Sequence, residues 1–164
     1  MKKVLIAYWT KTGSTKETAD TIGNILIVNN FDVVVSPISS CPDLSDFDIC
    51  IIGAPINGMK WVQEASDFIE THATVLSQKT TVLFCLSYIY LTGSSLWQNV
   101  IAKTLKPFAE KSRAIETAIF GGRVEEPLPF PMRIMFGIKK DSPLNLVSVD
   151  KISQWVQELI PRLS

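Results

Sequence analysis

The sequence of 164 residues lacks the features that mark several common classes of protein. It has one histidine and three cysteines, and their spacing does not suit a metal site. Sixteen basic residues balance sixteen acidic ones, so no net charge attracts nucleic acid. No apolar run approaches the roughly 20 residues of a membrane span, and the N-terminal run is too short for a signal peptide. We therefore expect a cytoplasmic protein with neither a metal centre nor a nucleic-acid partner.

Two phosphate-binding motifs and two related kinds of site are also missing. There is no G-x-x-x-x-G-K-[ST], the loop that binds nucleoside triphosphates, and no G-x-G-x-x-G, the dinucleotide fingerprint. No cysteine follows the first apolar run, which disfavours a thiolate phosphatase built on that turn. No acidic pair ends the same run, which disfavours a magnesium-dependent phospho-acceptor domain.

Short apolar runs alternate with helical patterns along the whole chain. This alternation predicts an α/β fold in one domain, residues 1–164, with a parallel sheet between two layers of helices. The expected strands are residues 3–9, 32–37, 48–53, 81–86 and 114–121. The expected helices begin near Lys16, span about 62–75 and 148–162, and include one from Ser94 or Ser95 to Phe108. Cys50 and Cys85 fall inside strands, where we expect them to be buried, and Cys41 falls in a loop.

The segment Thr10-Lys11-Thr12-Gly13-Ser14-Thr15 links the first strand to the first helix. A strand–turn–helix arrangement directs backbone N–H groups toward the positive end of the helix, where a phosphate is stabilised. Four hydroxyl side chains add donors, and Gly13 lets the backbone approach a ligand closely. A plain helix cap would need only one or two hydroxyls. The segment therefore predicts a phosphate site.

The same residues resemble the phosphate loop of the flavodoxins, [ST]-x-T-G-x-T, at Thr10, Thr12, Gly13 and Thr15. Ser14 and Lys11 occupy the free positions, and Lys11 either adds charge to the site or points into water. The resemblance implies FMN as cofactor and a flavodoxin-like three-layer α/β/α sandwich, with a five-stranded parallel sheet of order 2-1-3-4-5. The balanced charge departs from the acidic character common among flavodoxin carriers.

Two further loops should meet the phosphate loop at the carboxyl edge of such a sheet. One follows the third strand and runs from Ala54 to Trp61, and the other runs from Ser87 to Gly93. In the flavodoxins, which this chain resembles, these loops enclose the flavin ring, often with an aromatic side chain on one face. A glycine-containing peptide near N5 of the ring can flip when the flavin is reduced. The residues expected to bind the ring are Pro55, Ile56, Asn57, Gly58, Trp61, Ser87, Tyr88, Tyr90 and Gly93. Trp61 has a competing interpretation as a residue packed on the sheet at the helix start, and of Tyr88 and Tyr90 we expect one to face the site.

An insert at about residues 123–146 separates the last strand from the last helix. It carries apolar residues beside Arg133, Lys139 and Lys140, and its layout resembles the insert of the menaquinone-dependent protoporphyrinogen dehydrogenases, another flavodoxin-like family. The strand ending Phe120-Gly121-Gly122-Arg123-Val124 resembles theirs too. The insert either covers a substrate, makes peripheral membrane contact through residues 130–140, or packs against the protein's own edge.

The resemblance implies an FMN-binding redox protein that carries electrons between partner oxidoreductases. The first alternative is a flavin-dependent oxidoreductase of the protoporphyrinogen dehydrogenase type, which oxidises a porphyrinogen-like molecule and passes electrons to a quinone. The second is a flavin-free interaction module. No residue stands out as a catalytic acid or base, and outer-sphere electron transfer requires none.

Overall fold

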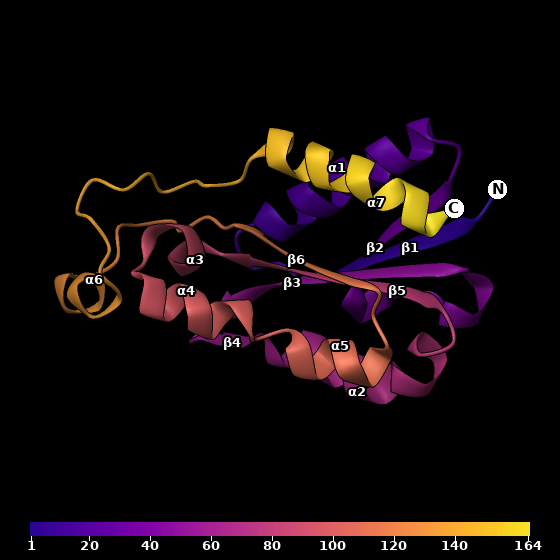
Figure 1. The fold of residues 1–164 in the computed structure, drawn as a ribbon, viewed down its shortest axis with the longest axis horizontal. Helices are drawn as coiled ribbons and strands as arrows, with labels where there is room; N and C mark the ends of the chain where they lie inside the picture. The colour runs from indigo at the N-terminus through magenta and orange to yellow at the C-terminus, as the bar shows by residue number, and fades with distance from the viewer.

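The computed structural model describes all residues, 1–164. A twisted sheet lies between two layers of helices (Figure 1). The parallel strands are β1 (Lys3–Tyr8), β2 (Asp32–Pro37), β3 (Ile49–Asn57), β5 (Thr80–Ser87) and β6 (Glu116–Gly121). Their order is β2-β1-β3-β5-β6, and the short β4 (Lys60–Trp61) pairs only with β3, in antiparallel fashion. The predicted flavodoxin-like order 2-1-3-4-5 is confirmed once β4 is set aside.

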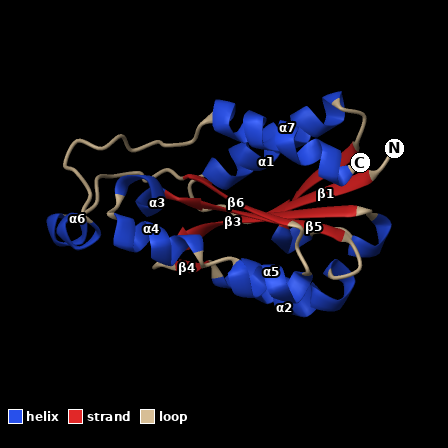
Figure 2. Ribbon diagram, viewed as in Figure 1, coloured by secondary structure: helices blue, strands red, loops and turns tan.

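The helices divide between the two faces of the sheet (Figure 2). One face carries α1 (Ser14–Val28) and α7 (Val149–Leu163). The other carries α2 (Gln63–Leu76), α4 (Ser95–Ala102) and α5 (Lys106–Ser112). The remaining helices are α3 (Tyr88–Thr92) and α6 (Phe130–Phe136), with 3₁₀ turns at Ile38–Ser40 and Leu44–Asp46. None of these helices combines the length and apolar character that a membrane crossing requires.

Alternation along the central strands builds two cores, one on each face of the sheet. In β1, Val4 and Ile6 belong to the core under α1 and α7, whereas Leu5 and Ala7 belong to the core over α2. Successive side chains of a strand point to opposite faces, so a strand covered on both sides is apolar throughout. Every residue of β5 after Thr80 is buried for this reason. Cys50 and Cys85 are buried in the same way, as predicted.

One expectation about the helices is wrong. The helix predicted from Ser94 or Ser95 to Phe108 is two helices, because the chain turns at residues 103–105 and α5 restarts with Pro107 in its first turn. Proline has no N–H for a preceding turn and is favoured at a helix start. Val100, expected to be buried there, is 43% exposed. The insert contains α6, which lies at the end of the molecule beyond the carboxyl edge of the sheet (Figure 1).

Candidate functional site

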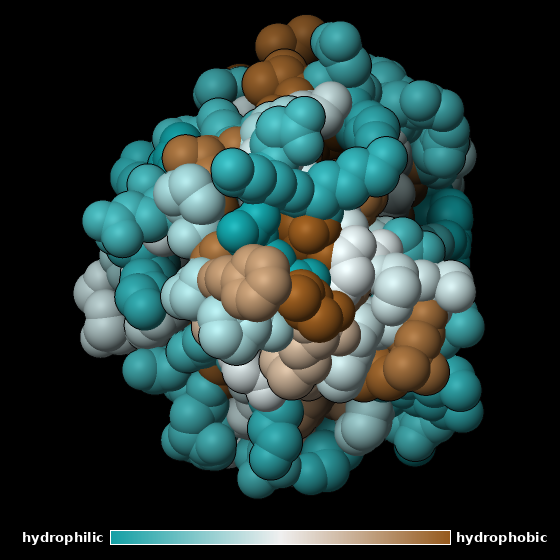
Figure 3. Space-filling view, turned by 90° about the vertical axis from the view of Figure 1, so that its left-hand side faces the viewer, coloured by the Kyte–Doolittle hydropathy of each residue, from teal (hydrophilic) through white to brown (hydrophobic).

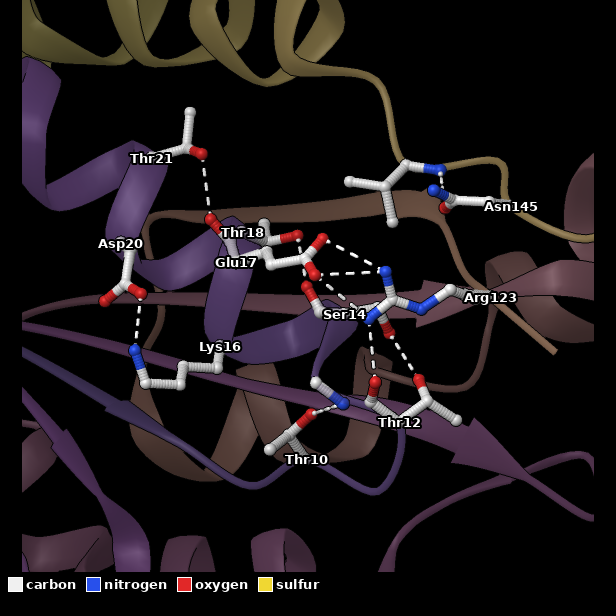
Figure 4. Close-up of polar contacts among 12 residues, drawn as sticks. Thr10, Thr12, Ser14, Lys16, Glu17, Thr18, Asp20, Thr21, Arg123 and Asn145 are labelled. Carbon is white, nitrogen blue, oxygen red and sulfur yellow. Dashed lines mark hydrogen bonds and ion pairs between the residues drawn. The ribbon is translucent and has the colours of Figure 1, made fainter. Parts of the chain in front are cut away.

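The loop between β1 and α1 has the backbone geometry of an anion cradle. Gly13 has a φ of 87°, in the left-handed region that a residue with a Cβ rarely adopts. Its N–H donates to Thr10 Oγ1 at 3.0 Å, and the hydroxyls of Thr12 and Ser14 lie 3.1 Å apart (Figure 4). Gly13 itself caps α1, so the first N–H groups of a 15-residue helix begin at this loop.

Thr15 carries the clearest sign that this loop is built to meet another group. Its side chain is fully buried, and its Oγ1 has no hydrogen-bond partner. Thr18, one turn further along α1 and equally buried, donates its hydroxyl to the Ser14 carbonyl at 3.0 Å. A buried hydroxyl without a partner costs about 1–3 kcal/mol, so the unpaired Thr15 is a polar group that a ligand at the loop would satisfy.

Arg123, at the base of the insert, completes the surroundings of the loop. Its Nη2 donates to the Thr12 carbonyl at 2.7 Å, and both terminal nitrogens donate to the Glu17 carboxylate, at 3.0 Å for the shortest contacts (Figure 4). A Cβ added to Gly13 would stand 3.3 Å from the same Nη2. Arg123 lies at the start of the insert in the sequence, and its place in the site was not predicted. The available signal was its position two residues after β6, at the carboxyl edge where the other loops meet.

Two adjoining cavities extend from the loop along the carboxyl edge of the sheet. The first, of about 120 Å³, is lined by Trp9, Lys11, Thr12, Ser14, Pro55, Ile56, Asn57, Leu86, Tyr88, Gly122, Arg123 and Val124. The second, of about 200 Å³, is lined by Ile56, Asn57, Gly58, Met59, Ser87, Tyr88, Ile89, Val124, Leu128, Met132 and Phe136. Four residues belong to both linings, so a polar end at the loop continues into a mainly apolar end under α6.

Two larger hollows lie elsewhere and touch none of these loops. One of about 370 Å³ lies between the edge strand β6 and α7, beside the ion pair of Arg162 and Glu116. Another, of about 410 Å³, lies beside His72 and Cys41. Burial raises the pKa of the Cys41 thiol to about 11, so it carries a proton at neutral pH and is a poor nucleophile.

A two-residue turn between β3 and β4 forms one wall of the apolar cavity. Gly58 and Met59 have φ angles of 57° and 65°, and the flanking Asn57 and Lys60 pair across the hairpin. Two successive left-handed residues are the geometry of a type I′ turn, which suits Gly58 and strains Met59. The turn holds Asn57 at the junction of the two cavities, with polar groups near an otherwise apolar wall.

Most of the predicted site residues lie at this edge of the sheet. Nine line the cavities: Lys11, Thr12, Ser14, Pro55, Ile56, Asn57, Gly58, Ser87 and Tyr88. Thr10, Gly13 and Thr15 shape the loop itself. Of the two tyrosines, Tyr88 lines both cavities, and burial raises the pKa of its phenol, which keeps it neutral at physiological pH. The lining residues that were not singled out include Trp9, Met59 and Ile89, together with five from the insert.

Trp61, Tyr90 and Gly93 do not line either cavity. Trp61 is buried in the core over α2, where its Nε1 donates to the Ala54 carbonyl at 3.0 Å and its ring packs on Phe108. Tyr90 faces a separate hollow beside β6 and α7, because α3 is a helical turn and sends it away from the Tyr88 side. Gly93 joins α3 to α4 and leaves room for the Phe136 carbonyl, 3.2 Å from where its Cβ would stand.

Helix α6 of the insert closes the apolar cavity and leaves its outer side exposed. Leu128, Met132 and Phe136 face the cavity. The helix is fixed to α4 because Trp97 Nε1 donates to the Met135 carbonyl and Ser94 N to the Phe136 carbonyl, both at 2.8 Å. Phe130 and Ile134 are 66% and 65% exposed, and a view onto this end shows apolar surface at its centre (Figure 3).

The comparisons with known proteins agree with this architecture. The flavodoxin domain family matches residues 5–137. A short-chain flavodoxin associated with a bacterial microcompartment superposes with a TM-score of 0.67 at 19% identity, over 100% of both chains. Oxidised flavodoxin 1 from Bacillus cereus gives a TM-score of 0.63 at 20% identity, over 99% of both chains. Rubredoxin oxygen:oxidoreductase from Desulfovibrio gigas gives 0.64 at 12% identity, over 99% of this chain and 36% of that one.

A search of curated protein sequences found no significant match. The structural likenesses, all at low identity, show the fold. The family match covers most of the chain, including the loop at residues 10–15 and the loops at residues 54–61 and 87–93. The chain therefore belongs to the flavodoxin family.

Proposed function

We propose that this protein binds FMN and carries electrons between partner oxidoreductases. The observation that carries the proposal is the buried, unpaired hydroxyl of Thr15 in a loop of four hydroxyl side chains at the start of α1. Proteins of the flavodoxin family bind flavin, and the family match and the flavodoxin neighbours support the same role here. A domain used only for interaction would have no reason to leave this hydroxyl without a partner.

The residues at the carboxyl edge suit the two ends of FMN. Thr10, Thr12, Ser14 and Thr15, together with the first N–H groups of α1, would hold the phosphate. Tyr88, Ile56 and Ile89 would wall the ring, with Asn57 and Ser87 as polar partners. Bound FMN would supply the electron uptake and release, and the chain would orient it and keep water from its faces.

Titration of the purified protein with FMN tests the proposal. We expect the flavin fluorescence to change and the flavin absorption bands to shift as the protein is added, and heat should release one FMN per chain. A colourless preparation on which FMN has no spectral effect would overturn the proposal and leave the interaction module as the remaining interpretation.

The enzyme alternative is favoured by one observation, the apolar cavity that α6 closes. A carrier that exchanges electrons at an exposed ring edge has no need of the wall formed by Leu128, Met132 and Phe136. In the alternative, that wall would receive a flat organic substrate such as a porphyrinogen, and a quinone would accept the electrons.

Replacing residues 127–141 with a short glycine linker separates the two roles. The backbone on either side of the excision is paired, since Val124 N donates to the Leu144 carbonyl at 3.0 Å, so the sheet should remain intact. If the protein is a carrier, we expect electron exchange with a flavodoxin reductase to change by less than about threefold, or ~0.6 kcal/mol. Loss of a quinone-coupled porphyrinogen oxidation that the full chain performs, with FMN content retained, would instead assign the enzyme role.

A further inference from the structure

We propose that Arg123 is a charged partner of the cofactor's phosphate and makes the site select FMN over riboflavin, which lacks the phosphate. The inference rests on the proposed function of the preceding section. It adds a positively charged contact, made by a residue outside the loop, to the hydroxyls, the backbone N–H groups and Lys11 that the loop itself supplies.

The guanidinium of Arg123 is already held at the loop by the chain itself. Its Nη2 donates to the Thr12 carbonyl at 2.7 Å, and Arg123 lines the same cavity as Lys11, Thr12 and Ser14. The planar guanidinium has five donors, whose spacing fits two phosphate oxygens at once. Its side chain is 26% exposed, so its charge is screened less than that of a surface arginine.

The backbone that carries Arg123 is fixed on both sides. Gly122 accepts from Leu146 N at 3.0 Å, Val124 N donates to the Leu144 carbonyl at 3.0 Å, and Arg123 itself forms a bridge with Asn145. A charged group on such a braced segment keeps its position better than one on a free loop. Arg123 is therefore a built part of the site rather than a mobile side chain that happens to lie near it.

Glu17 binds the Arg123 guanidinium and would compete with a bound phosphate for its N–H groups. Its carboxylate accepts from both terminal nitrogens of Arg123 and lies in the first turn of α1, on the side of the helix that faces the loop (Figure 4). A phosphate at the same helix start would need some of these N–H groups and would be repelled by the negative carboxylate. Because the Thr12 carbonyl also holds Arg123, removal of the Glu17 charge should free the guanidinium without displacing it.

The test is a comparison of dissociation constants for FMN and riboflavin, measured by flavin fluorescence at low salt. For Arg123→Ala we expect FMN to bind about 10- to 100-fold more weakly, with riboflavin affinity unchanged. Arg123→Lys should lie between, because an ammonium restores the charge but not the paired donors. Lys111→Ala is the matched control: it removes one positive charge from an ion pair with Glu70 on the far helical layer and should change neither constant.

An unchanged ratio of the two constants in a folded Arg123→Ala protein would overturn the inference. If circular dichroism shows that Arg123→Ala does not fold, the Glu17→Gln variant tests the inference instead. It should bind FMN several-fold more tightly and riboflavin as before, and unchanged or weaker FMN binding would overturn the inference. Failure of the unaltered protein to bind either flavin would overturn the proposed function instead, so the two failures are distinguishable.

Discussion

Replacing Gly53 with alanine is expected to destabilise the fold by about 3 kcal/mol or more. Gly53 lies in β3, between Tyr8 of β1 and Phe84 of β5. A Cβ at this position would stand 1.9 Å from the Cζ of Phe84, a distance no packed pair of atoms tolerates. The Phe84 ring is fully buried and packs against Phe120 at 6.1 Å, so it has no free space to enter.

Chemical denaturation measures this effect, with two controls from the same chain. Gly58→Ala adds the same methyl group where nothing lies within 4 Å, so the only cost is that of a residue with a Cβ at a φ of 57°. We expect this variant to lose about 1 kcal/mol of stability. Phe84→Leu removes the clashing ring atoms, and the double variant with Gly53→Ala should lose less stability than the sum of the two single losses. Strict additivity, or a Gly53→Ala protein as stable as the parent, would contradict the steric account.

Both core faces could be predicted from the sequence because they depend on local patterns, whereas the strand order was predicted from the resemblance to the flavodoxins. In the sequence, Thr15, Ala19, Ile22 and Leu26 follow the spacing of one helix face, and all four are buried in α1. Ile152, Val156 and Leu159 have the same spacing and are buried in α7, which continues through Pro161 to Leu163. Helical spacing of apolar residues predicts which residues are buried because each helix must pack one apolar stripe against the sheet.

The site could be predicted less completely, since a residue's position along the chain does not determine which way its side chain points. Trp61 and Tyr88 both lie in loops predicted to enclose the site, yet Trp61 pairs in β4 and faces the core, while Tyr88 begins α3 and faces the cavities. The extra length of β3, which continues to Asn57, is responsible: the chain doubles back as a hairpin instead of entering a loop. This reversal of the chain is visible in the pairing of β3 with β4 and not in the sequence.

The contribution of the insert was hidden for a different reason. Pro131 near the start of α6 and Gly137 just after its end are ordinary helix signals, so the helix itself could have been predicted. Its docking on α4 depends on Trp97 and Ser94, which contact backbone carbonyls of α6. Contacts between distant segments through backbone groups carry no residue-specific pattern, so no reading of the insert alone indicates which wall it forms.

Replacing Thr15 with valine should have opposite effects on the free protein and on its affinity for FMN. Valine keeps nearly the same shape and removes a buried hydroxyl that has no partner. We therefore expect the free energy of unfolding, measured after removal of the cofactor, to rise by about 1 kcal/mol. The same change removes a phosphate donor, and FMN should bind about tenfold more weakly or worse.

Thr18→Val is the matched control, since Thr18 is equally buried in the same helix but donates to the Ser14 carbonyl. That variant should lose about 1 kcal/mol of stability and keep its FMN affinity. Binding to the folded state adds about 2.7 kcal/mol at 100 times the dissociation constant, whereas a protein that binds tenfold more weakly gains only about 1.4 kcal/mol from the same FMN concentration. Compared with the unaltered protein, Thr15→Val should therefore be more stable without FMN and less stable with it. If the order stays the same in both conditions, the Thr15 hydroxyl does not serve the phosphate.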